Sequence, residues 1–321
     1  MEYRKKLTTY SIVLVILVII GVLGIFFNNQ TQTELASQTP LLPGFVPKEA
    51  TLVQVNNATA GGAAEFLKSN NGTWTLRQGT EIYPANKERL EAFLAGLPKL
   101  TEFRRVAKVD PNTPSSLESY GLDKPKSLRI KDKLGKVLVD LQIGKIDDTG
   151  HWVYVRFVGK SQVWLTDRNQ LAFLEMGANA WTDLHIFPGD LKPSDLVRVS
   201  FTGKITTLDK KTYTSYELEK VQKNNKPAWE LMPEKTFPSN ADGYIDGLPQ
   251  FNANSYMKAD EKFNPATETQ GVLTVWTQNG QKIEVHLGAE QKDARVPASQ
   301  GGRRFWLTSW SLEQILFSNQ K

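Results

Sequence analysis

The feature that most constrains this chain is an uninterrupted apolar run near its N-terminus, from Tyr10 to Phe27. The run contains no charged residue and no proline. As a helix rising about 1.5 Å per residue it would be about 27 Å long, close to the hydrocarbon thickness of a bilayer. The sequence therefore predicts a transmembrane helix over residues 10–27.

Charge on either side of this run indicates its orientation. Arg4, Lys5 and Lys6 precede it, whereas residues 28–33 carry no positive charge. Because positively charged flanks stay in the cytoplasm, we expect residues 1–9 to be a cytoplasmic tail and the C-terminal domain to be extracytoplasmic, on the periplasmic side of a bacterial cytoplasmic (inner) membrane. The alternative is a cleaved signal peptide, whose apolar core would be about 7–15 residues long and followed by a small-residue cleavage site.

The rest of the chain divides by composition. Residues 28–46 are rich in Asn, Gln, Thr and Ser and contain two prolines, which is typical of a flexible linker. We place a first module at residues 47–190 and a second at 191–321. A hydrophobic content of 40% and a charged content of 23% suit two globular domains. The absence of cysteine excludes disulfides, thiolate metal ligands and cysteine nucleophiles.

Four landmarks recur in the same order in the two modules. They are Trp74-Thr75-Leu76 with Trp229-Glu230-Leu231; Tyr83-Pro84-Ala85-Asn86 and Gly96-Leu97-Pro98 with Phe237-Pro238-Ser239-Asn240 and Gly247-Leu248-Pro249; the strand, glycine turn and strand of residues 128–144 with 272–288; and Val163-Trp164-Leu165-Thr166 with Phe305-Trp306-Leu307-Thr308. Chance could supply one such match. Four in register predict an internal duplication.

Each module shows the same pattern of elements. Apolar residues alternate along several short segments, beginning at residues 51–55 and 196–201, as they do in half-buried strands. Asn86 and Asn240 stand where an N-cap would begin the main helix, and a short helix closes each module. The fold class predicted is α+β, with two repeated modules of antiparallel β-meanders that follow the transmembrane helix.

Several of these motifs also carry a family resemblance. They are Trp74-Thr75-Leu76, Leu97-Pro98, Tyr120-Gly121-Leu122 with Pro125, Ile143-Gly144 and Val163-Trp164-Leu165. Through these motifs the chain resembles the bacterial domain of unknown function 4340 family, whose members carry an N-terminal membrane helix. The resemblance covers most of residues 47–200, and the second module lacks the Tyr-Gly-Leu element. It implies no catalytic residue, and it implies association with ABC-2-type transporters of the gliding-motility type.

Motifs that carry chemistry are missing. His151, His185 and His286 do not have metal-ligand spacing, and the chain contains no phosphate-binding glycine loop and no serine-hydrolase motif. We therefore expect a protein that is not an enzyme, with no catalytic residues, no cofactor and no metal site. A net charge of +5, part of it in the N-terminal tail, does not indicate a nucleic-acid partner.

The tryptophans suggest where a partner could bind. Four of the eight recur between the modules and are expected in the core. The candidate interaction surface comprises those that do not recur and a basic pair, namely Trp152, Trp181, Trp276, Trp310, Arg303 and Arg304. Burial of these tryptophans in the core, and a solvated charged turn at the arginines, remain open alternatives.

Three functions follow from these observations. The first is a non-enzymatic, membrane-anchored accessory or scaffold subunit of an ABC-type transport complex, with transporter subunits as partners. The second is an extracytoplasmic glycan- or lipid-binding module. The third is a hydrolase, which the missing constellation disfavours.

Overall fold

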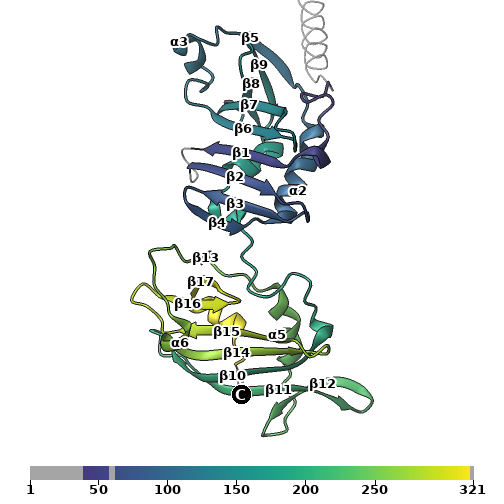
Figure 1. Ribbon diagram of the computed structural model, residues 1–321, viewed down its shortest axis with the longest axis vertical. Coiled ribbons are helices and arrows are strands. Elements are labelled where there is room, and N and C mark those ends of the chain that lie inside the picture. Colours follow the sequence, from purple (N-terminus) through teal and green to yellow (C-terminus); the bar gives the residue numbers. More distant parts are fainter. Residues whose placement is uncertain (1–38, 58–61, 319–321) are drawn as a thin grey trace, which may run out of the picture. The chain divides into compact units, whose positions relative to one another are not determined.

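The computed structural model describes residues 39–57 and 62–318 (Figure 1). The chain divides into two compact units between Trp181 and Thr182. We call the described residues 39–181 unit 1 and residues 182–318 unit 2. The segment 182–190, expected in the first module, therefore belongs to unit 2, where Ile186 and Phe187 are buried in the core.

Unit 1 is built on one nine-stranded sheet with the order β4-β3-β2-β1-β6-β7-β8-β9-β5, in which every neighbouring pair is antiparallel. In chain order its elements are η1 (Pro47–Glu49), β1 (Leu52–Asn57), β2 (Gly62–Lys68), β3 (Trp74–Gln78), β4 (Glu81–Pro84), α2 (Lys87–Gly96), η2 (Leu97–Lys99), β5 (Arg104–Lys108), α3 (Pro114–Glu118), β6 (Lys126–Lys131), β7 (Val137–Ile146), β8 (Trp152–Phe157), β9 (Gln162–Asp167), η3 (Asn169–Glu175) and α4 (Ala178–Trp181).

Unit 2 is built on an eight-stranded antiparallel sheet with the order β12-β11-β10-β14-β15-β16-β17-β13. Its elements are η4 (Pro193–Asp195), β10 (Leu196–Thr206), β11 (Thr212–Lys223), β12 (Lys226–Met232), α5 (Ala241–Gly247), η5 (Leu248–Gln250), β13 (Ser255–Tyr256), α6 (Pro265–Glu268), β14 (Thr269–Thr277), β15 (Lys282–Gly288), β16 (Arg295–Gln300), β17 (Arg303–Thr308) and α7 (Ser309–Ile315).

The two sheets have the same strand order when β1–β3 are matched to β10–β12, β6–β9 to β14–β17, and β5 to β13. The main helix, the turn that follows it and the closing helix also fall at the same points along the chain. Only β4 lacks a strand to match, and an isolated bridge between Leu231 and Thr236 stands in its place. Both units are thus α+β with antiparallel sheets.

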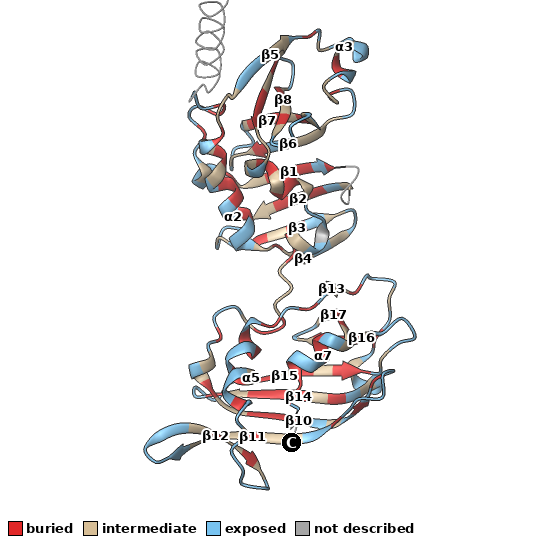
Figure 2. Cartoon of the chain, turned by 180° about the vertical axis from the view of Figure 1, so that it is seen from behind, coloured by how far each residue is buried: buried red, intermediate tan, exposed pale blue. Residues whose placement is uncertain are grey.

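One face of each sheet is buried under the helices, because apolar residues alternate along the strands. Val53 and Val55 of β1 lie in the core with residues of α2 and η3, and Val199 and Phe201 of β10 lie in the core with residues of α5 and α7. Figure 2 shows the buried residues gathered along the central strands.

The landmark tryptophans do not all occupy matching places. Trp74 and Trp229 each pack in the main core of their unit. Trp164 packs against the main core of unit 1, whereas Trp306 lies in a separate cluster beside Phe263, and Phe305 is the residue that enters the main core. Because a shift of one residue turns a strand side chain to the other face, the expected pairing of Trp164 with Trp306 is out of register.

The linker expected over residues 28–46 ends earlier than its composition indicates. Leu41, Leu42 and Phe45 are buried in the core of unit 1, and the Leu41 N–H donates to the Leu100 carbonyl oxygen at 2.7 Å. Three large apolar side chains between prolines supply enough surface to pack, which the proline content obscured. Residues 28–38, and with them the expected transmembrane helix at 10–27, lie outside the described residues. Within the described part, no helix has the length and apolar character needed to cross a membrane.

Both main helices begin directly after the expected asparagine, but only the helix of unit 1 is capped by its side chain. The Asn86 Oδ1 accepts from the Arg89 N–H at 3.0 Å and caps α2 as expected. The Asn240 side chain instead donates to the Ser318 carbonyl oxygen at 3.0 Å and makes no cap, so α5 starts without one. The closing element of unit 1 is the 3-10 helix η3 rather than an α-helix.

Two of the family motifs interlock at a close backbone approach. The Lys145 N–H donates to the Tyr120 carbonyl oxygen at 2.9 Å. A Cβ built on Gly144 would lie 2.1 Å from that same oxygen, and Gly121 needs a positive φ of 64° to make the turn. The Tyr-Gly-Leu and Ile-Gly motifs therefore hold the segment after α3 against β7, which is a structural role.

Substitution of Gly144 by alanine is expected to destabilise unit 1 by about 1–3 kcal/mol, because the added methyl group overlaps the Tyr120 carbonyl oxygen. Urea unfolding of the full chain, followed by tryptophan fluorescence, measures the loss. Gly189→Ala is the control, since a Cβ there meets no atom within 4 Å. Equal unfolding midpoints for the two variants would contradict the interlock.

Candidate functional site

A hollow with a volume of about 670 Å³ lies between α5 and α7 of unit 2. We call it the α5–α7 groove. Aromatic and amide side chains dominate its lining, which comprises Asn240, Gly243, Tyr244, Gly247, Gln250, Phe251, Asn252, Trp310, Glu313, Gln314, Leu316, Phe317 and Ser318.

Two glycines of α5 keep the groove open. Gly243 and Gly247 are four residues apart and therefore lie on the same face of the helix. A Cβ built on either would meet no atom within 4 Å. The backbone of α5 is thus accessible along one helical turn. Gly247 is part of a repeated landmark, but neither glycine was predicted to line a site, although their spacing within a short helix was a visible signal.

A pair of tyrosines fixes the position of α7 beside the groove. The Tyr244 hydroxyl donates to the Ile315 carbonyl oxygen at 2.9 Å, and the Phe317 N–H donates to the Tyr216 hydroxyl oxygen at 3.0 Å. The two hydroxyl oxygens are 2.9 Å apart. Since the single proton of Tyr244 is committed to Ile315, Tyr216 must donate to Tyr244. The end of α7 is thereby bound to both α5 and β11.

Burial keeps both hydroxyls neutral. It raises the pKa of Tyr216 to about 12, against the opposing effect of the Phe317 N–H and Tyr244 hydrogen bonds. Burial also raises the pKa of Tyr244 well above its ordinary value, and the neighbouring Tyr216 adds to this shift. At neutral pH the pair is a fixed hydrogen-bonding network rather than a source of phenolate.

Trp310 stands at the rim of the groove, in the first turn of α7, with 64% of its surface exposed. Glu313, the one charged residue among the described residues of the lining, forms an ion pair with Lys211. Gln314 and Asn252 add uncharged hydrogen-bonding groups. The groove therefore offers one large exposed ring, open helix backbone and amide side chains.

Unit 1 has a corresponding but smaller hollow of about 440 Å³ between α2 and η3. Helix α2 is ten residues long and α5 is seven, so α5 is shorter by about one turn. Ala92 lines the hollow of unit 1, and a Cβ on Gly96 would lie 3.1 Å from the Gln170 side chain. No exposed tryptophan lines it.

The other expected surface tryptophans make contacts within the protein. Trp181 is fully buried in the core of unit 1, where its Nε1 donates to the Phe173 carbonyl oxygen at 2.9 Å, so it cannot contribute to a surface. Trp152 stacks on Phe103 with ring centroids 3.7 Å apart. Trp276 lies under the Arg198 guanidinium, 3.9 Å from the ring centroid.

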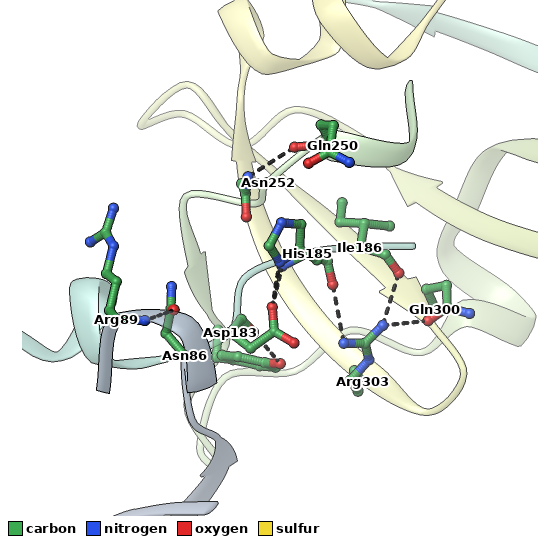
Figure 3. Close-up of polar contacts among 10 residues, drawn as sticks. Asn86, Arg89, Asp183, His185, Ile186, Gln250, Asn252, Gln300 and Arg303 are labelled. Atoms are coloured by element: carbon green, nitrogen blue, oxygen red, sulfur yellow. Dashed lines mark hydrogen bonds and ion pairs between the residues drawn. The ribbon is translucent and has the colours of Figure 1, made fainter. Parts of the chain in front are cut away.

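The expected basic pair also serves the fold. Arg303 donates to the carbonyl oxygens of His185 at 3.1 Å and Ile186 at 2.8 Å, and to the Gln300 side chain at 2.8 Å (Figure 3). Arg304 donates to the Glu261 carbonyl oxygen at 2.9 Å. Of the six expected residues, Trp310 is the one that the structure places at an open groove.

The described residues show no cluster of three or more His, Asp or Glu side chains that could hold a metal ion. His151 precedes β8, His185 lies beside Asp183 at 2.7 Å, and His286 lies in β15. None of the three lines the α5–α7 groove.

Comparison with known proteins gives a family and nothing beyond it. Residues 74–269 match the family described as a domain of unknown function (DUF4340), which is more than half of the chain. The match begins in β3 of unit 1 and ends at the start of β14 in unit 2, so it both begins and ends later than the expected residues 47–200. Neither a curated protein nor a solved structure matches the chain.

The tyrosine pair and Trp310 should behave differently when substituted. Tyr244→Phe leaves the Ile315 carbonyl oxygen and the Tyr216 hydroxyl without their partner, so we expect unit 2 to lose about 1–3 kcal/mol of unfolding free energy. Trp310→Ala should change it by less than about 0.5 kcal/mol, because the ring is mostly exposed. Urea unfolding measures both. A large loss for Trp310→Ala would show that this ring is part of the core.

The tyrosine pair should also make stability fall at alkaline pH. Both pKa values are raised in the folded state, so the pair stabilises fully below the unfolded value near pH 10, and that contribution is lost as pH rises toward 12. We expect the unfolding free energy to fall more steeply above pH 10 in the native chain than in the Tyr216→Phe/Tyr244→Phe variant. Parallel pH profiles from urea unfolding would count against neutral hydroxyls.

Proposed function

Because the chain belongs to the DUF4340 family, we propose that it is a non-enzymatic accessory or scaffold subunit of an ABC-type transport complex. Residues 10–27 anchor it in the bacterial cytoplasmic membrane, with the N-terminus in the cytoplasm and both units outside. Unit 2 binds a protein partner of that complex in the α5–α7 groove. The observation that carries this proposal is the open groove with Trp310 exposed at its rim.

The groove has the properties of a protein-binding site. Its volume of about 670 Å³ is in the range of ligand sites, and exposed tryptophans are over-represented among the residues that dominate binding energy. Open helix backbone at Gly243 and Gly247 allows a partner segment to approach closely. Amides of Asn252 and Gln314 can pair with the partner's backbone groups.

The chemistry of the groove favours binding over catalysis. Its carboxylate, Glu313, is paired with Lys211, and the Tyr244 hydroxyl is committed to a backbone carbonyl. General acid–base catalysis needs a group that can exchange a proton near neutral pH, and burial moves the pKa of Tyr244 still further above that range. These features support a non-enzymatic role. In this groove, neither Glu313 nor Tyr244 is free to act as the acid or base of a hydrolase.

The shared order of elements supports an internal duplication of an α+β module. In this proposal both copies kept the hollow between the main and closing helices. In unit 2 the main helix is shorter by about one turn, which widens the groove, and Trp310 stands exposed at its rim. Unit 1 kept the connection to the anchor, so the two copies divide anchoring and binding between them.

A second candidate is an extracytoplasmic glycan-binding module, which the same groove favours for a different reason. An exposed indole can stack on a sugar ring, and amides of Gln250, Asn252 and Gln314 can pair with hydroxyl groups. A lipid ligand fits less well, since these amides would have no partners along an acyl chain.

Filling the groove tests the proposal. Gly243→Leu places a side chain in open space on α5, so it should block the groove without destabilising unit 2. We expect the full-length protein, purified in mild detergent, to recover ABC transporter subunits, and the variant to recover them about tenfold less or worse. Quantitative mass spectrometry of the pull-down measures recovery.

The matched control is Ala92→Leu, which fills the hollow of unit 1 in the same way. Its recovery of transporter subunits should equal that of the native chain. Unchanged recovery with Gly243→Leu would overturn the groove as the partner site. Binding of purified bacterial glycans that depends on Trp310, with no transporter subunit recovered, would favour the second candidate.

A further inference from the structure

Exposed apolar side chains gather at one end of unit 1, among lysines. The apolar residues are Val46, Leu134, Val137 and Val158, with exposed fractions of 44, 84, 47 and 42%, and the lysines are Lys48, Lys131, Lys133, Lys136 and Lys160. The Thr51 N–H donates to the Lys131 carbonyl oxygen at 3.0 Å and the Val158 N–H to the Asp140 carbonyl oxygen at 3.1 Å. A shallow hollow lined by Leu41–Phe45, Lys136–Leu138 and Phe157 joins these segments.

The turn between β6 and β7, Lys131–Lys136, is the most prominent part of this end. The Asp132 carboxylate accepts from the backbone N–H groups of Leu134 at 2.8 Å and Lys136 at 2.9 Å. The acid is thus engaged with the turn's own backbone. Leu134 is held outward in solvent between Lys133 and Lys136.

The corresponding turn of unit 2 shows that the fold does not require this leucine. Between β14 and β15 the turn is Thr277–Gln281, in which the Thr277 N–H donates to the Gln281 carbonyl oxygen at 3.0 Å. The Asp132 N–H donates to the Lys136 carbonyl oxygen at the same distance in unit 1. The glycines match, with φ of 81° at Gly135 and 82° at Gly280. Its sequence, Gln-Asn-Gly-Gln, has neither an apolar nor a charged side chain.

The position along the chain indicates what this end faces. The described chain begins at Thr39, and Leu41–Phe45 lies against Lys136–Leu138. The residues between Phe27 and Thr39, 28–38, can span at most about 40 Å. If residues 10–27 cross the bilayer, this end of unit 1 stays within that distance of its surface.

We propose that the Lys131–Lys136 turn, with Val46, Val137 and Val158 beside it, docks on the anionic phospholipid surface of the membrane that holds the anchor. This inference rests on the membrane anchorage under Proposed function. Leu134 enters the boundary between headgroups and acyl chains, while the lysine stems lie along it and their ammonium groups meet phosphates. Docking orients unit 1 on the bilayer and leaves the α5–α7 groove to partners.

A fluorescence measurement on the full-length protein tests this docking. Because the chain has no cysteine, Ser161→Cys places one environment-sensitive label in the β8–β9 turn at the lysine-rich end. Thr80→Cys places it in the β3–β4 turn, at the opposite end of the same sheet. Each protein is reconstituted in nanodiscs of phosphatidylcholine, alone or with phosphatidylglycerol, carrying lipids brominated on the acyl chains.

With phosphatidylglycerol present, the label at position 161 should be quenched about twofold or more relative to the label at 80, with blue-shifted emission. The difference should vanish in pure phosphatidylcholine. It should also vanish in the Lys133→Gln/Leu134→Asn/Lys136→Gln variant, which carries the turn sequence of unit 2 and therefore folds.

Three results would overturn the docking: equal quenching at 161 and 80, quenching that persists in phosphatidylcholine, or quenching that survives the turn exchange. Docking of this end on a transporter subunit instead would appear as protection from aqueous quenchers only when that subunit is added. A chain that fails to co-purify with nanodiscs would contradict the membrane anchorage itself. Failure of the anchorage can therefore be distinguished from failure of the docking.

Discussion

The fold of both units depends on burying one face of each antiparallel sheet. The strands alternate apolar and polar residues, and the covered face needs a helix layer to exclude water. In unit 1 that layer includes α2 and η3, and in unit 2 it includes α5 and α7. The space between main and closing helix is therefore a consequence of the fold. Its width is set by the length of the main helix and by what ties the closing helix down.

Unit 2 shows how such a space becomes a site. The hydroxyls of Tyr216 and Tyr244 hold the end of α7 in place, so the shorter α5 leaves a groove instead of allowing the helices to close together. Gly243 and Gly247 leave the wall of α5 bare, and Trp310 stands free at the rim. Tyr244 thus belongs both to the buried hydrogen-bonding network and to the lining of the groove.

Much of the fold could be predicted because period-two alternation and N-cap chemistry are local signals. The strands around Val53, Leu128 and Val139 and the cap at Asn86 were predicted and are present. Strand β16 has no such local signal and was missed, because it contains Pro297 in its interior. The predicted pairing of Trp164 with Trp306 was wrong because a motif match between strands does not determine which face of the sheet each residue occupies.

The site was predictable only in part. Trp310 was singled out as an unmatched tryptophan, and the structure places it, exposed, at the rim of the groove. Trp181 and Arg303 instead donate hydrogen bonds to backbone carbonyl oxygens within their units, and no side-chain pattern in the sequence reveals such contacts. The groove itself arises from the length of α5 relative to α2, a difference that becomes meaningful only once the two helices are known to occupy the same place in each unit.

We propose that this protein is tethered to the membrane and binds a partner beside a transporter. The measurement that tests this proposal most directly is complementation of a deletion strain by the native chain and by the same domain exported without residues 1–27. Tethering raises the effective concentration of weak contacts, so the released domain should fail to restore the phenotype although it is folded and present at the same level. Full complementation by the released domain would contradict the account.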